Sequence, residues 1–159
     1  MHEDLGRVDY LFCDKTGTLT KNELVFNKWA SGGQINPDRY LESTKADLSR
    51  ENQLKDLLRC IVLCHDVLLI NLNGSVEQKS GASQDELCLL DMVENKNMAK
   101  LVARDATSMT VEIMGQIEVY DIVKVNEFSS DRKMMSVVVR DRSTGQLRVF
   151  AKGASDALA

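Results

Sequence analysis

The chain has 159 residues, of which 43% are hydrophobic and 28% charged, and its formal net charge at pH 7 is −4. This length suffices for one domain with a buried core, and the composition is typical of a globular protein. The acidic balance argues against general nucleic-acid binding, which normally needs a basic surface.

The four cysteines lack the density and spacing of a disulfide scaffold, which favours a reducing compartment. Polar residues directly after Met1 are not typical of a signal peptide. The most apolar stretch, "CIVLCHDVLLI", is too short to span a bilayer and is interrupted by His65 and Asp66. We therefore expect a soluble, monomeric chain.

The first part of the chain contains two expected strands and a long expected helix. The apolar run in "RVDYLFCD" predicts a strand at residues 8–13, and "ELVFNKWA" (23–30) alternates enough for a second one. Residues 31–47 hold glycines and the only proline, so we expect a loop there. Apolar residues at steps of three and four predict a helix over 49–70 with one apolar stripe: Leu54, Leu57, Leu58, Ile61, Cys64 and Leu68.

A second helix is predicted to begin near Ser83, because Ser83 and Glu86 have the spacing of a capping box. The last third is β-branched and alternating, in "SMTVEIMG", "QIEVYDIVKVNEF", "KMMSVVVR" and "QLRVFAK", and "RDRSTGQ" is a hairpin signal. Together these elements predict an α+β fold, an antiparallel sheet of at least four strands with helices packed against it.

Asp14 stands at the end of the first expected strand, where α/β folds place their active sites. The hydroxyls and backbone amides of the following "TGTLT" can hold a phosphate oxygen or orient Mg²⁺, and Lys15 adds a cation. The carboxylate can then attack a phosphoryl group as a nucleophile. By themselves, the residues fit a second interpretation equally well: a polar turn in which Asp14 caps backbone amides and has no catalytic role.

The string "DKTGTLT" resembles the phosphorylation signature of P-type ATPases. The resemblance implies that Asp14 is the autophosphorylated nucleophile, that Lys15 neutralises phosphate charge, and that Asp14 and the Thr16 carbonyl contribute to a magnesium site. Soluble phosphatases of the wider haloacid-dehalogenase-like group usually carry an acid/base aspartate where this chain has Thr16. Without that group an aspartyl phosphate should hydrolyse slowly, which suits a pump better than a phosphatase.

The segments "NEFSSDRKMMSVVVR" and "VFAKGASDALA" offer an aromatic ring and cations for a nucleotide. By themselves, the residues favour a core Phe128 and a solvated turn over 131–133. P-type ATPases, however, carry a Phe, a "DRK-x-MSV" strand and "KGA" in this order within their nucleotide-binding domain. The resemblance therefore implies that Phe128 stacks on adenine and that Lys152 lies at the bottom of the adenine pocket; the implied ATP-binding residues also include Arg132, Lys133 and Gly153.

Glu86, in "SQDELCLL", resembles the glutamate of the family's "SPDE-x-AL" element, which contacts the adenine amino group. Gln84 stands in place of the proline, and Leu87-Cys88 replaces the usual small pair. Glu86 also has a structural interpretation, as the return partner of Ser83 in the capping box.

Two further segments resemble the P4 branch of the family, the phospholipid flippases: "IVLCHDV" is similar to its "LCHTV", and "LGRVDYLFCDKTGTLTKN" to its "LGQVEYIFSDKTGTLTQN". The resemblance implies an ATP-binding fragment at the cytosolic face of a membrane. In the intact pump, ATP with Mg²⁺ would phosphorylate Asp14 to drive phospholipid translocation. The alternatives are a fragment of a calcium-type cation pump and a soluble haloacid-dehalogenase-like phosphatase.

The family's "TGD", "GDGxND" and "TGE" strings do not occur in this sequence. We therefore expect residues 1–29 to be the incomplete, poorly ordered start of a phosphorylation domain. Residues 30–159 are expected to form a C-terminally truncated nucleotide-binding domain that binds nucleotide without turnover. Cys60, Cys64 and His65 do not make a four-ligand metal set, and we expect them to belong to the core.

Overall fold

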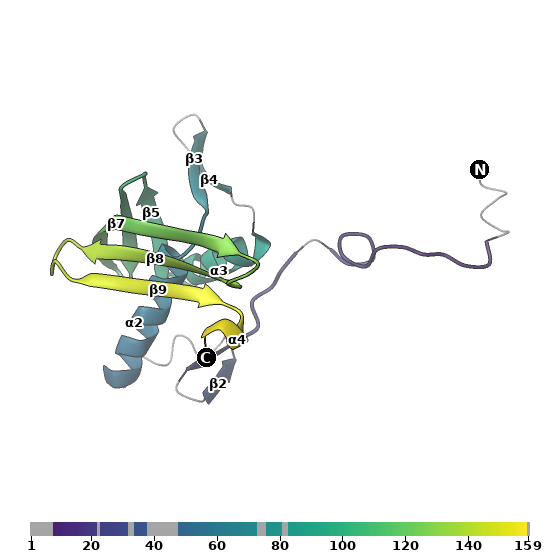
Figure 1. Ribbon diagram of the computed structural model, residues 1–159, viewed down its shortest axis with the longest axis horizontal. Coiled ribbons are helices and arrows are strands. Elements are labelled where there is room, and N and C mark those ends of the chain that lie inside the picture. Colours follow the sequence, from purple (N-terminus) through teal and green to yellow (C-terminus); the bar gives the residue numbers. More distant parts are fainter. Residues whose placement is uncertain are drawn as a thin grey trace.

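The central element of the fold is a five-stranded antiparallel sheet whose strands follow one another in chain order (Figure 1). The computed structural model describes residues 8–21, 23–31, 34–37, 48–72, 76–80 and 83–158. The strands are β5 (Ala99–Arg104), β6 (Ser108–Ile113), β7 (Gln116–Ser129), β8 (Met134–Asp141) and β9 (Leu147–Gly153). The predicted α+β fold with an antiparallel sheet is confirmed, and β5 is a strand beyond the four that were expected.

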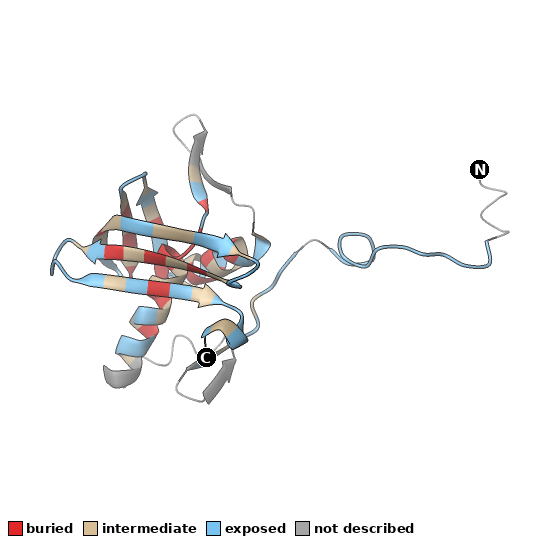
Figure 2. Cartoon of the chain, in the orientation of Figure 1, coloured by how far each residue is buried: buried red, intermediate tan, exposed pale blue. Residues whose placement is uncertain are grey.

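One face of this sheet packs against two helices, α2 (Leu48–Leu63) and α3 (Gln84–Asn95). Residues 108–113 of β6 and residues 134–139 of β8 alternate between half-buried and buried, as expected when only one face of a sheet meets helices. Figure 2 shows this alternation along β8. The core between the two layers includes Leu54, Leu58, Leu90, Leu101, Val111, Tyr120, Val137 and Phe150. A short helix, α4 (Ser155–Leu158), follows β9.

Two features predicted from short motifs, the start of a helix at Ser83 and the last hairpin, are present in the structure. The Ser83 hydroxyl accepts the Glu86 N–H at 3.4 Å, so Ser83 is the N-cap of α3. The "RDRSTGQ" segment joins β8 to β9, with the Gly145 N–H donating to the Asp141 carbonyl at 2.8 Å. Gly145 has a φ of 71°, a left-handed conformation that glycine adopts without strain.

The predicted helix over 49–70 is too long, because α2 ends at Leu63. Residues 64–67 are not helical, and β3 (Leu68–Leu72) follows, paired with β4 (Val76–Ser80). The apolar residues at 67–70 fit a strand as well as a helix. The apolar periodicity of the sequence therefore did not show that the helix ends before them. Leu68, the last member of that stripe, is exposed.

Three further predictions near the N-terminus are wrong in detail. Residues 8–13 form no strand and are exposed, since among the described residues they have no neighbouring strand to pair with. In 23–30 only the last part is a strand, β1 (Lys28–Ser31), and it pairs with β2 (Gln34–Pro37) inside the predicted loop. The rest of that predicted loop, residues 32–33 and 38–47, lies outside the described residues.

The segment 8–21 runs away from the sheet and its helices (Figure 1), whereas Phe26 and Trp29 already pack against the core. The proposed boundary between residues 29 and 30 stays a prediction. Within the described ranges, no helix combines the length and the apolarity needed to cross a membrane.

Candidate functional site

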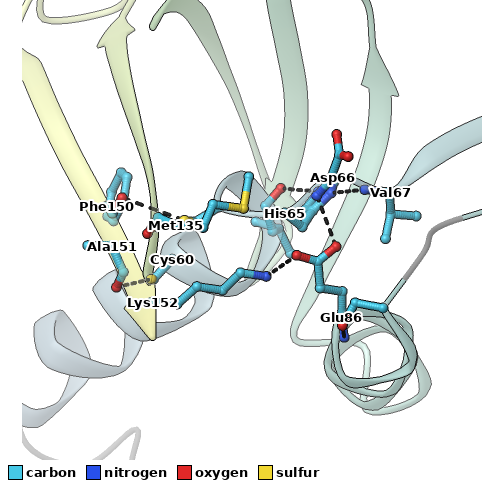
Figure 3. Close-up of polar contacts among 12 residues, drawn as sticks. Cys60, His65, Asp66, Val67, Glu86, Met135, Phe150, Ala151 and Lys152 are labelled. Carbon is cyan, nitrogen blue, oxygen red and sulfur yellow. Dashed lines mark hydrogen bonds and ion pairs between the residues drawn. The ribbon is translucent and has the colours of Figure 1, made fainter. Parts of the chain in front are cut away.

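Lys152 and Glu86, two of the residues predicted to bind a nucleotide, face each other and form an ion pair (Figure 3). Lys152 lies on β9 opposite Met135 of β8, and its side chain extends toward the first turn of α3. Glu86 is in that turn because Ser83 begins the helix three residues earlier. The fold thus joins residues that are 66 positions apart in the sequence.

The Glu86 side chain is almost fully buried, yet both of its carboxylate oxygens have donors. Oε1 accepts from the Lys152 ammonium, and Oε2 accepts the Asp66 N–H at 3.0 Å. Burial alone would raise the pKa of this carboxyl, but the bonds from Lys152 and from the Asp66 N–H outweigh it and hold the pKa below its ordinary value. Glu86 is therefore an ionised acceptor, and its oxygens serve this network instead of closing a capping box onto Ser83.

The turn at residues 64–67 supplies the amide that binds Glu86. His65 is buried at its centre, where Nε2 lies 3.0 Å from the Val62 carbonyl and Nδ1 accepts the Val67 N–H at 3.0 Å. Burial, and then the nearby Arg104 guanidinium, lower the pKa of His65 to about 4. The imidazole is thus neutral, with its proton on Nε2, which donates to Val62.

A cavity of about 300 Å³ lies beside this ion pair. Glu86, Lys152 and Gly153 line it together with mainly apolar side chains from α2 and α3. Phe26 and Trp29, which the sequence reasoning did not single out, also line it. An apolar hollow with a few converging polar groups is the usual form of a small-molecule site.

The other predicted nucleotide contacts are not among the residues lining this cavity. Phe128 is 63% exposed at the end of β7, so the core position favoured by the residues alone is wrong. Arg132 donates to the Glu127 carbonyl and the Ser129 hydroxyl, in the turn that precedes β8. Lys133 forms an exposed ion pair with Asp156 of α4, with Nζ and Oδ2 2.7 Å apart.

Gly153, at the end of β9, is paired with Met134 at the start of β8. A Cβ atom on this residue would stand 2.4 Å from the Lys133 carbonyl oxygen and 2.7 Å from the Met134 Cβ. Both contacts are shorter than van der Waals distances, and the oxygen belongs to the backbone. The glycine of the "KGA" string is thus required by close packing of the two strands.

Replacing Gly153 by Ala is therefore expected to lower the free energy of unfolding by about 2 kcal/mol, because the two strand ends must separate to admit the methyl group. Urea denaturation would measure the loss. Ala151→Gly provides a control on the same strand, since Ala151 is exposed. If Gly153→Ala proves as stable as the unchanged chain, close packing does not explain this glycine.

Asp14, Lys15 and Thr16 lie in the exposed segment 8–21, which runs away from β9, the strand that carries Lys152 (Figure 1). The Asp14 carboxylate accepts the N–H of Lys15 at 2.7 Å, and the Lys15 carbonyl accepts the N–H groups of Leu19 and Thr20. This is the local turn that the residues alone allowed. Among the described residues, no cluster of three or more acidic, cysteine or histidine side chains could hold a metal ion.

Cys60, in the last turn of α2, and Cys64, directly after that helix, use their thiols as donors to the sheet. Cys60 Sγ lies 3.6 Å from the Ala151 carbonyl, and Cys64 Sγ lies 3.6 Å from the Phe150 carbonyl. Burial raises the pKa of both thiols, that of Cys64 to about 11. Both are therefore protonated packing groups at neutral pH.

The sequence is similar to members of one protein family along nearly its whole length. Residues 53–159 match the family described as P-type ATPase, cytoplasmic domain N. The chain is 32% identical to Phospholipid-transporting ATPase 2 of Arabidopsis thaliana, across 98% of this chain and 14% of that protein. It is 29% identical to Phospholipid-transporting ATPase tat-1 of Caenorhabditis elegans, across 97% of this chain and 14% of the relative. The chain thus spans about a seventh of the length of these curated relatives.

Proposed function

The chain belongs to the P-type ATPase family, and from that premise we propose that it binds ATP beside the Glu86–Lys152 pair, as part of a phospholipid-transporting ATPase. The observation that carries this proposal is the ion pair at the wall of an apolar cavity of about 300 Å³. A cavity of this size lies within the range of small-molecule sites.

The chemistry of the site suits an adenine nucleotide. A base fits apolar walls, and an ionised Glu86 accepts hydrogen bonds without donating any, so it would bind an amino group of the base. Lys152 carries a positive charge that would interact with the nucleotide once the ion pair opens. We propose that Phe128, which is exposed, stacks on the base, and that Arg132 and Lys133 approach the phosphates.

In the whole protein, we propose that Asp14 is the phosphoryl acceptor. A carboxylate oxygen of Asp14 would attack the γ-phosphorus, the bond from that phosphorus to the bridging oxygen would break, and ADP would leave. Asp14 is exposed and its carboxylate binds only the adjacent Lys15 N–H among the described contacts, so it is accessible to such a ligand.

The oxygens of Asp14 and Thr16 fit Mg²⁺, which takes oxygen ligands and often keeps several waters beside one or two carboxylates and a phosphate. When bound, the ion would neutralise the charge that develops on the transferred phosphoryl group. Thr16 offers no acid/base group to hydrolyse the aspartyl phosphate, which favours a pump intermediate over phosphatase turnover.

The names of the relatives support lipid over cation transport, since the curated proteins cited above are phospholipid-transporting ATPases. We therefore propose a location at the cytosolic face of a membrane, with phospholipid as the transported substrate of the intact pump. In such a protein, ATPase activity should rise with added aminophospholipid rather than with calcium.

Titration of the 159-residue chain with ATP by calorimetry tests the binding proposal. We expect saturable binding without turnover, and we expect Phe128→Ala to weaken it at least about fivefold, because base–aromatic stacking contributes about 1–3 kcal/mol. Ile117→Ala is the matched control, since Ile117 is a similarly exposed apolar residue of the same strand, at 60% against 63%.

Two results would contradict this proposal. Equal losses in both variants would mean that β7 has been disturbed in general and that Phe128 has no special role. Turnover of a phosphomonoester by the isolated chain would favour the soluble phosphatase instead.

A further inference from the structure

Arg104, on β5, places its guanidinium in the turn that supplies the amide for Glu86. Its side chain is only 9% exposed. Nη1 donates to the His65 carbonyl at 2.7 Å and to the Val67 carbonyl at 3.1 Å, and lies 3.1 Å from His65 Nδ1. Arg104 thus joins the middle of the turn to the edge strand of the main sheet.

This arrangement is not an ordinary ion pair. The Asp66 carboxylate is 4.0 Å from Arg104 Nη2 and is two-thirds exposed, so it offers little compensation for burying the guanidinium. The buried charge is instead stabilised by backbone carbonyls and a neutral imidazole. Charged donors hold such acceptors more strongly than neutral donors do.

A single peptide group connects Arg104 to Glu86, because Arg104 binds its carbonyl, which belongs to His65, and Glu86 binds its N–H. That carbonyl and the Asp66 N–H belong to the same peptide unit, which is planar and rigid. Arg104 binds one end of the unit at 2.7 Å, and Glu86 Oε2 accepts from the other end at 3.0 Å. A cation at the carbonyl also polarises the N–H and strengthens the bond that it donates.

We propose that Arg104 is a positioning residue for nucleotide binding, which acts through the His65–Asp66 peptide to orient the Glu86 carboxylate. The proposal rests on the function proposed above. It divides the carboxylate into two roles. Oε2 is held by the peptide, while Oε1, which now binds Lys152, is the oxygen that a ligand amino group would share or take over.

His65 supports the same arrangement from inside the turn. Its Nδ1 faces two donors, the Val67 N–H and Arg104, so this nitrogen accepts and carries no proton. The ring therefore fixes the turn on both sides of Asp66. Neither His65 nor Arg104 needs to touch the nucleotide for this role.

The role has a consequence for the choice of base. Adenine presents an amino group where guanine presents a carbonyl oxygen, so an ionised and oriented carboxylate favours ATP over GTP. If Glu86 loses its orientation, or takes up a proton and becomes a donor, this preference should decline. A variant that only destabilises the fold would leave the preference unchanged.

The first test needs no nucleotide. In the 159-residue chain, the pH titration of the Glu86 carboxyl carbon is followed by NMR, with Glu86→Gln used to assign the signal. We expect Arg104→Met to raise the pKa of Glu86, and Arg104→Lys, which keeps the charge and the donors, to restore most of the difference. Val139→Ala is the control, because it also removes buried volume from the core. Val139 lies on β8, toward the end of that strand remote from Met135, the residue opposite Lys152. An unchanged Glu86 pKa in Arg104→Met would overturn the proposal.

The second test measures ATP and GTP affinities of the same variants. We expect Arg104→Met to weaken ATP binding about tenfold, the value of one hydrogen bond to a charged group, and to bring the two affinities closer together. Val139→Ala should keep the ratio of the two affinities. If Arg104→Met does not fold at the assay temperature, Arg104→Gln replaces it. Failure of the unchanged chain to bind ATP would refute the proposed function, whereas an unchanged affinity ratio in Arg104→Met would refute the positioning role alone.

Discussion

Replacement of Arg59 by Met is expected to lower the free energy of unfolding by about 3 kcal/mol, because it leaves a largely buried carboxylate without its cation. Arg59, on α2, binds the Glu118 carboxylate of β7 with two bonds, from Nε at 2.9 Å and from Nη2 at 2.7 Å. The side chains are only 15% and 20% exposed. The Tyr120 hydroxyl donates to the same carboxylate at 2.7 Å.

This two-bond geometry explains why we expect more than the small effect of a surface ion pair. The hydrogen bonds that Arg59 donates to Glu118 raise the pKa of Arg59. The bonds that Glu118 accepts from Arg59 and Tyr120 outweigh burial and lower the pKa of Glu118, so both groups are charged at neutral pH. The pair therefore fastens α2 to the face of the sheet where the core lies.

Urea denaturation of three chains measures the effect: the unchanged chain, Arg59→Met, and a double variant with Glu118→Leu. Since removal of both charges leaves no buried carboxylate, the double variant should regain at least half of the lost stability. Arg148→Met is a milder control, because Arg148 forms only a partly exposed pair with Asp56. A loss below about 1 kcal/mol for Arg59→Met would place this pair with ordinary surface pairs.

The sheet could be predicted from the sequence because its signals are local. Alternation along 108–152 and the turn residues Asp141 and Gly145 specify strands and a hairpin without reference to distant parts of the chain. The N-cap at Ser83 is equally local. By contrast, the end of α2 depends on the buried turn at 64–67, which is held by Arg104 from another strand.

The candidate site was predictable only in part, and for a similar reason. Motif resemblance identified Glu86 and Lys152, but it did not indicate that they pair with each other across the interior. Arg104 is a single basic residue at the end of a strand, and nothing in its neighbours distinguishes a buried guanidinium from an exposed one. Phe26 and Trp29 line the cavity through contacts that periodicity does not encode. Long-range contacts between polar groups, rather than secondary structure, therefore limit what the sequence predicts.

Acidification from pH 7 to pH 5 is expected to cost the fold about 2 kcal/mol through His65 alone. The pKa of this imidazole is about 4 in the folded chain against an ordinary value of 6.5. The unfolded chain therefore takes up a proton below about pH 6.5, whereas the folded chain does not until about pH 4. Stability is lost as the pH falls through that window, by about 1.4 kcal/mol for each pH unit well inside it. Two buried or half-buried carboxyl groups with lowered pKa values, Glu86 and Glu118, add their own loss only below about pH 4.5, where they are protonated in the unfolded chain.

The cause of this sensitivity is the geometry of one nitrogen. His65 Nδ1 accepts the Val67 N–H at 3.0 Å and faces Arg104 at 3.1 Å, so protonation there would remove an acceptor and set two cations side by side. His65→Asn keeps an acceptor oxygen near this position but cannot titrate, so we expect its stability to stay level between pH 7 and pH 5. Urea midpoints at half-unit intervals of pH separate the two chains. If stability falls with pH by the same amount in the unchanged chain and in His65→Asn, the pH sensitivity arises at another group. The neutral His65 imidazole would then not be the group that stabilises the turn at residues 64–67.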